Sequence, residues 1–105
     1  MVIRYALSVV LMLVLTGPSR AEEGTKVTIE NFTFNPAVLT VKAGTAVTFE
    51  NADDIPHSLV GKAGEFHSKA VDTGESFTFV FKTAGEVDYF CGLHPHMVGK
   101  ISVQP

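Results

Sequence analysis

The chain has 105 residues, a formal net charge of −3, one cysteine, no tryptophan and eight phenylalanines. This length allows one small domain and excludes a two-domain enzyme or a large α/β barrel. The acidic balance argues against nucleic-acid binding, which needs a basic surface. A single cysteine excludes an internal disulfide, a c-type haem attachment and a multi-cysteine zinc site.

The first 21 residues have the layout of a cleavable signal peptide. Met1–Arg4 carries one basic side chain, and Tyr5–Leu15 is almost entirely apolar. Ser19-Arg20-Ala21 then places small residues at the −3 and −1 positions of a cleavage site. A transmembrane anchor is the alternative, but spanning a bilayer takes about 20 apolar residues, and this run has about half that number. We therefore expect export to the periplasm and a mature single domain formed by residues 22–105.

Past this leader, apolar and polar residues alternate with period two between turn residues, which is typical of half-buried antiparallel strands. The expected strands are Lys26–Glu30, Phe32–Phe34, Val38–Lys42, Thr45–Asn51, Phe77–Phe81, Val87–Cys91 and Lys100–Val103. Ala43-Gly44 predicts a hairpin, and Gly61–Gly74 is interpreted as a loop or a short irregular helix. Turns about every 8–12 residues predict a β-sandwich or barrel.

Aromatic side chains are the expected core of this domain. A small β-domain buries little surface, and each aromatic side chain contributes a large apolar area. We expect seven phenylalanines to be core residues and not a cofactor platform: Phe32, Phe34, Phe49, Phe77, Phe79, Phe81 and Phe90.

Three side chains that can bind a metal follow one another at equal spacing near the C-terminus. Once the leader is removed, Cys91 is the only cysteine and Met97 the only methionine, and His94 lies midway between them. On a helix they would drift about 120° around the axis, and Pro95 would interrupt that helix. Convergence therefore requires a loop. Exported proteins normally pair their cysteines, so this lone thiol is either buried and inert or occupied.

A thiolate, imidazoles and a thioether together form a soft donor set that favours copper over zinc, calcium or magnesium. Cysteine with two histidines and a weak axial methionine is the blue-copper arrangement. The loop supplies one clear imidazole, and His57 is the best candidate for the second. His67 and His96 compete for that role, although both are expected to be solvated surface residues. Taken singly, each predicted ligand has a structural alternative, such as a buried thiol or a core methionine.

The sequence resembles the cupredoxins, or type 1 blue copper proteins, over nearly all of residues 22–105. The motifs are F-x-F-x-P at Phe32–Pro36, V-K-A-G-T at Val41–Thr45, V-T-F-x-N at Val47–Asn51, P-H at Pro56-His57, T-A-G-E-x-x-Y-x-C at Thr83–Cys91 and G-K-I at Gly99–Ile101. The short C-x-x-H-x-x-M spacing is similar to that of the amicyanin group. The resemblance implies an all-β Greek-key sandwich of about seven to eight short strands and one copper ion that cycles between Cu(I) and Cu(II). It implies four ligands: His57, Cys91, His94 and Met97.

The resemblance also implies a monomeric electron carrier and not an enzyme. Its partners would be redox proteins, such as methylamine dehydrogenase and a c-type cytochrome. Two residues depart from the family pattern. Ser58 replaces an asparagine that usually ties the ligand loops together. His96 replaces an aromatic residue of the amicyanins and places a titratable group on the docking face expected around His94.

Two other functions remain open at this point. A periplasmic copper carrier or chaperone would use the same ligands and deliver metal instead of electrons. A Cys–His nucleophilic enzyme is disfavoured, because no third group is evident to orient the histidine and Met97 would have no role.

Overall fold

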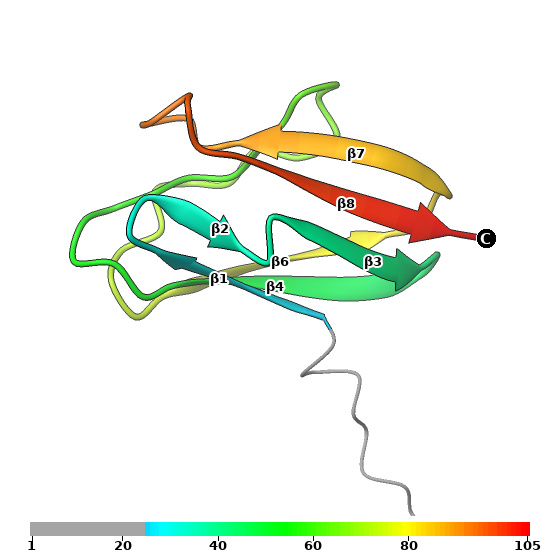
Figure 1. Ribbon diagram of the computed structural model, residues 1–105, viewed down its shortest axis with the longest axis horizontal. Helices are drawn as coiled ribbons and strands as arrows, with labels where there is room; N and C mark the ends of the chain where they lie inside the picture. Colours follow the sequence, from blue (N-terminus) through cyan, green and yellow to red (C-terminus); the bar gives the residue numbers. More distant parts are fainter. Residues whose placement is uncertain (1–24) are drawn as a thin grey trace, which may run out of the picture.

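The computed structural model describes residues 25–105, and the expected signal peptide lies outside them. Within 25–105 the chain forms eight strands in two four-stranded sheets, which pack as the two layers of a sandwich (Figure 1). None of these described residues forms a helix long and apolar enough to cross a membrane. The predicted all-β sandwich is confirmed.

The strand order in each sheet brings distant segments side by side. The first sheet has the order β2 (Thr33–Asn35), β1 (Lys26–Glu30), β4 (Thr45–Asn51) and β6 (Ser76–Phe81). The second has the order β3 (Val38–Lys42), β8 (Val98–Gln104), β7 (Gly85–Phe90) and β5 (Val60–Gly61). β1 pairs with β4, and β3 with β8, in parallel. The expectation of antiparallel pairing alone is therefore wrong, because the chain crosses repeatedly between the two sheets.

The hairpin predicted at Ala43-Gly44 is also wrong. β3 and β4 belong to different sheets, so this turn carries the chain across the sandwich. The Ala43 N–H donates to Gln104 O at 2.7 Å, and the Gly44 N–H donates to Phe81 O at 2.7 Å. Gly44 has φ +93°, a backbone conformation that residues with a side chain rarely adopt. The glycine correctly marks a turn, but local sequence does not say which sheet the next strand joins.

The core lies between the two sheets and follows the predicted alternation. Of the seven phenylalanines expected there, three are buried, namely Phe34, Phe49 and Phe81. Phe77 and Phe79 are partly buried and pack against that core, while Phe90 is half-buried. Phe32 is 50% exposed, so its assignment to the core is wrong.

The eighth phenylalanine, Phe66, is a core residue that the sequence analysis missed. It belongs to the segment left open as a loop or an irregular helix, which forms turns and isolated bridges. Its ring contacts five aromatic rings, those of Phe49, Phe77, Phe79, Phe81 and Tyr89. The one sequence signal was the apolar Phe66 between the polar residues Glu65 and His67, and the structure shows these as buried, exposed and exposed, respectively.

Three connections gather at the left end of the sandwich in Figure 1. They are the turn between β1 and β2, the segment between β4 and β5, and the loop between β7 and β8. The predicted ligands lie in the second and third of these connections. The strands thus act as a frame that brings His57 and Cys91 to the same end.

Candidate metal centre

Cys91, His94 and Met97 lie in one compact loop. Cys91 follows the last residue of β7, and Met97 precedes the first residue of β8. The Cys91 N–H donates to Met97 O at 3.0 Å and closes the loop at its base. Two further bonds fold the interior, from His94 N–H to Cys91 O at 3.2 Å and from Met97 N–H to His94 O at 2.9 Å. The expectation that a loop presents these residues is confirmed.

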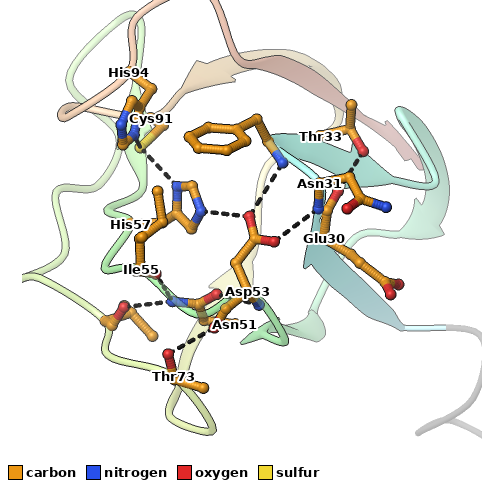
Figure 2. Close-up of polar contacts among 12 residues, drawn as sticks. Glu30, Asn31, Thr33, Asn51, Asp53, Ile55, His57, Thr73, Cys91 and His94 are labelled. Atoms are coloured by element: carbon orange, nitrogen blue, oxygen red, sulfur yellow. Dashed lines mark hydrogen bonds and ion pairs between the residues drawn. The ribbon is translucent and has the colours of Figure 1, made fainter.

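His57 reaches the same point from the segment that follows β4. Its backbone pairs with Val71, donating to Val71 O at 3.1 Å and accepting from the Val71 N–H at 2.7 Å. Its side chain is fully buried. This pairing fixes the backbone from which the imidazole projects toward the loop after β7 (Figure 2).

The donor atoms converge at distances that suit a bound metal ion. Cys91 Sγ lies 3.5 Å from His57 Nδ1 and 3.8 Å from His94 Nδ1. All three ligand atoms lie within 4.8 Å of one another. Metal bonds of about 2.0–2.3 Å set at about 120° would separate two donors by about 3.5–3.8 Å. The thiolate and the two imidazoles therefore fit a trigonal site for a soft ion.

Met97 is buried at the end of this loop, with 6% of its surface exposed. Its position and burial agree with an axial thioether, and this role stays a prediction. His67 and His96, the rivals for the second imidazole, are both exposed. The convergence of His57 with Cys91 and His94 instead agrees with the preferred assignment.

Ser58 links the two ligand-bearing segments. Its N–H donates to Cys91 Sγ at 3.4 Å, and its Oγ accepts from the Gly92 N–H at 3.0 Å. The serine hydroxyl thus makes a direct tie where the family asparagine was expected to make one. A Cβ at position 92 would lie 2.7 Å from Ser58 Oγ. A glycine is therefore required for this close approach.

A carboxylate that the sequence analysis did not single out holds the other nitrogen of His57. Asp53 Oδ2 lies 2.8 Å from His57 Nε2. Burial raises the pKa of the Asp53 carboxyl, but hydrogen bonds from Phe32, His57 and Asn31, together with attraction to His57, outweigh burial and lower its pKa below the usual value. An ionised carboxylate only accepts hydrogen bonds. Nε2 therefore carries the proton, and Nδ1 is free to face Cys91.

Two further residues at the site were missed. The Asn51 side chain is buried and donates to Ile55 O and Val71 O, both at 2.8 Å, which shapes the turn before His57 (Figure 2). The Phe32 ring meets His57 and His94 edge-on, with centroids 5.8 and 5.1 Å apart. The spacing of Asp53 four residues before His57 was the available signal for the carboxylate. Phe32 has no such signal, because its contacts depend on the tertiary structure.

Comparisons with known proteins agree with this geometry. The chain matches the family described as Cupredoxin-like domain over residues 4–103. It is 33% identical over 85 residues to amicyanin-alpha of Methylorubrum extorquens, covering 76% of this chain and 71% of that protein. It is 39% identical over 89 residues to chloroplastic plastocyanin of Tetradesmus obliquus, covering 68% and 58% respectively. The solved structure of a purple cupredoxin from Nitrosopumilus maritimus has a TM-score of 0.71 at 30% identity, covering 76% of this chain and 99% of that one.

Proposed function

The chain belongs to the cupredoxin family, and on that premise we propose that it is an exported blue copper protein that carries single electrons between redox partners. Its cofactor is one copper ion. We assign the metal to His57, Cys91, His94 and Met97. The observation that carries this assignment is the approach of two imidazole Nδ1 atoms to one thiolate, at 3.5 and 3.8 Å.

When bound, copper supplies reversible exchange of one electron between Cu(I) and Cu(II). The protein's part is to keep the donor atoms in place while the charge changes. The N–H group of Ser58 points at the Cys91 sulfur, and the Ser58 hydroxyl fixes the next backbone amide, that of Gly92. A loop closed by its own backbone bonds and tied to a second segment limits rearrangement, and this favours rapid transfer.

Burial of the site favours an electron carrier over a copper carrier. His57 and Cys91 are fully buried, so an acceptor thiol would have to displace protein before it reached the metal. Electrons need only a close approach to a ligand edge. His94 is the half-buried ligand, and we propose its imidazole as the point of exchange.

The surface beside His94 suits brief contact with a redox protein. Leu93 is 53% exposed, and Pro95 is also exposed. A small apolar rim of this kind supports weak, transient docking. We propose an amine dehydrogenase and a c-type cytochrome as partner classes, on the resemblance to amicyanins, with the periplasm as the location and residues 22–105 as the mature monomer.

The absorption spectrum of the copper-loaded protein tests the proposal. We expect Cu(II) to produce an intense blue charge-transfer band that disappears on reduction and returns on reoxidation. Cys91→Ser removes the thiolate, so the band should be absent while the far-ultraviolet circular dichroism of the sandwich is retained. His96→Ala, which alters an exposed histidine of the same loop, serves as the control and should keep the band. A colourless wild-type copper complex would contradict the assignment.

A further inference from the structure

One carboxylate joins the turn between β1 and β2 to the metal centre. Asp53 Oδ1 accepts from the Asn31 N–H at 2.8 Å, and Oδ2 accepts from the Phe32 N–H at 3.1 Å. The same Oδ2 lies 2.8 Å from His57 Nε2. Figure 2 shows the Asp53 carboxylate between Asn31 and the His57 imidazole. The carboxylate thus joins its own connection between β4 and β5, which carries His57, to the distant turn formed by Asn31 and Phe32.

The backbone of Asp53 is itself held in place. Its N–H donates to Asn51 Oδ1 at 2.9 Å, and its carbonyl accepts from Thr73 Oγ1 at 2.6 Å. Asp53 has only 9% of its surface exposed. The carboxylate is therefore a fixed anchor and not a mobile surface group.

The turn held by this anchor has an uncommon backbone conformation for a phenylalanine. Asn31 and Phe32 have φ values of 52° and 57°. This left-handed region is uncommon for residues with a side chain, and especially for a bulky one. A turn of this kind suits the two-residue hairpin between β1 and β2, and a polar interaction with its N–H groups stabilises it further. The two N–H groups of the turn find that interaction in the Asp53 carboxylate.

The turn places an aromatic ring on the metal ligands. Phe32 meets the rings of His57 and His94 at interplanar angles of 85° in both cases. Phe32 is 50% exposed while the His57 ring beneath it is fully buried, so we infer that the Phe32 ring covers the imidazoles from the solvent side. An edge-to-face contact of this kind is favourable. A different backbone at residues 31 and 32 would remove it.

We propose that Asp53 is a positioning residue that fixes the His57 imidazole with Nδ1 toward Cys91 and at the same time locks the Asn31-Phe32 turn so that the Phe32 ring covers both imidazoles. The inference rests on the proposed function only where it concerns the metal. The hydrogen bonds and ring contacts exist in the protein without metal, where they can be measured separately.

The charge on Asp53 has a second consequence for the bound metal. A carboxylate hydrogen-bonded to a ligand stabilises the more positive oxidation state. Removing the charge should therefore raise the midpoint potential. Asp54 is adjacent and exposed, so its charge is screened by water and acts weakly. Asp53→Asn and Asp54→Asn change the net charge equally and differ in their contact with His57.

The first experiment uses the metal-free protein and nitrogen-15 NMR of the histidine rings. In the wild type we expect His57 to be protonated at Nε2 and the His94 ring protons to carry a ring-current shift from Phe32. Asp53→Asn should mix the His57 tautomers and reduce the ring-current shift. Asp54→Asn should change neither. A wild-type His57 protonated at Nδ1, or unchanged spectra in Asp53→Asn, would overturn the proposal.

Phe32→Leu tests the ring contact separately from the orientation of His57. It can also be measured if Asp53→Asn does not fold. It should abolish the ring-current shift and keep the His57 proton at Nε2.

The copper-loaded proteins supply a further measurement. In Asp53→Asn the Cu(II)/Cu(I) equilibrium should move at least tenfold toward Cu(I), or about 59 mV, and in Asp54→Asn by less. Equal shifts would contradict the positioning role. A colourless copper complex would refute the proposed function and leave the NMR result standing.

Discussion

At the scale of single residues, Tyr89 combines close packing with an unsatisfied polar atom. Its ring packs against Phe34 and Phe49, with centroids 4.7 and 5.2 Å apart. Within residues 25–105 its buried hydroxyl has no hydrogen-bond partner. Burial raises the pKa of the Tyr89 phenol above its usual value. The ring stabilises the core, and the hydroxyl carries a desolvation cost.

Tyr89→Phe should therefore raise the free energy of unfolding by about 1 kcal/mol at neutral pH, since an unpartnered buried polar group costs about 1–3 kcal/mol. Above pH of about 10, the usual phenol pKa, the unfolded wild type loses a proton that the folded state retains. Wild-type stability should then fall faster with pH than that of Tyr89→Phe. Urea unfolding from pH 7 to 11 measures both effects, and a destabilised variant at pH 7 would contradict them.

At the scale of elements, the irregular segment between β5 and β6 supplies two residues of the hydrophobic core, Phe66 and Val71. Phe66 inserts from it between the two sheets and faces the aromatic side of β6, formed by Phe77, Phe79 and Phe81. The segment also supplies Val71, which pairs with the His57 backbone. Packing of this segment and the position of one ligand are therefore coupled.

Phe66→Ala should lower the free energy of unfolding by about 3–5 kcal/mol, because it leaves a cavity among buried rings. Phe32→Ala is the matched control, since it removes the same side chain from a half-exposed position. It should lower the free energy of unfolding by less. Denaturant unfolding of the metal-free proteins measures both. Equal losses in the two variants would show that Phe66 does not hold the core together.

At the scale of the whole molecule, the two sheets create a metal site that exists only when they are assembled. His57 and Cys91 are 34 residues apart, and the unfolded chain does not keep them together. A metal that binds the folded state stabilises it by mass action. Metal affinity and fold stability are thus linked properties of the sandwich.

Adding copper should raise the melting temperature. At a free copper concentration one hundred times Kd, the free energy of unfolding should increase by about 2.7 kcal/mol. Removing copper with a chelator should reverse it. Calorimetry with and without the metal measures the effect. Mg²⁺ is the control, because it prefers oxygen ligands and should give no shift. A melting temperature unchanged by copper would contradict binding at this site.

Alternation of apolar residues and the spacing of Cys91, His94 and Met97 were sufficient to predict an all-β domain and one loop rich in metal-binding side chains. Both features are local, because strand faces repeat every two residues and a short loop keeps its members close. His57 was predicted as the partner imidazole from its chemistry and its position after a strand, and its Nδ1 lies 3.5 Å from Cys91 Sγ. Its rivals are exposed, as expected.

Tertiary structure alone decided the features that depend on contacts between distant segments. Gly44 marks a turn, but the pairing of β3 with β8 makes it a crossing between sheets. Phe32 resembles a core residue in sequence, yet the Asp53 carboxylate holds its backbone in a left-handed turn that directs the ring onto two histidines. Neither outcome is encoded within a short window, because each requires partners that only the assembled sheets bring within reach.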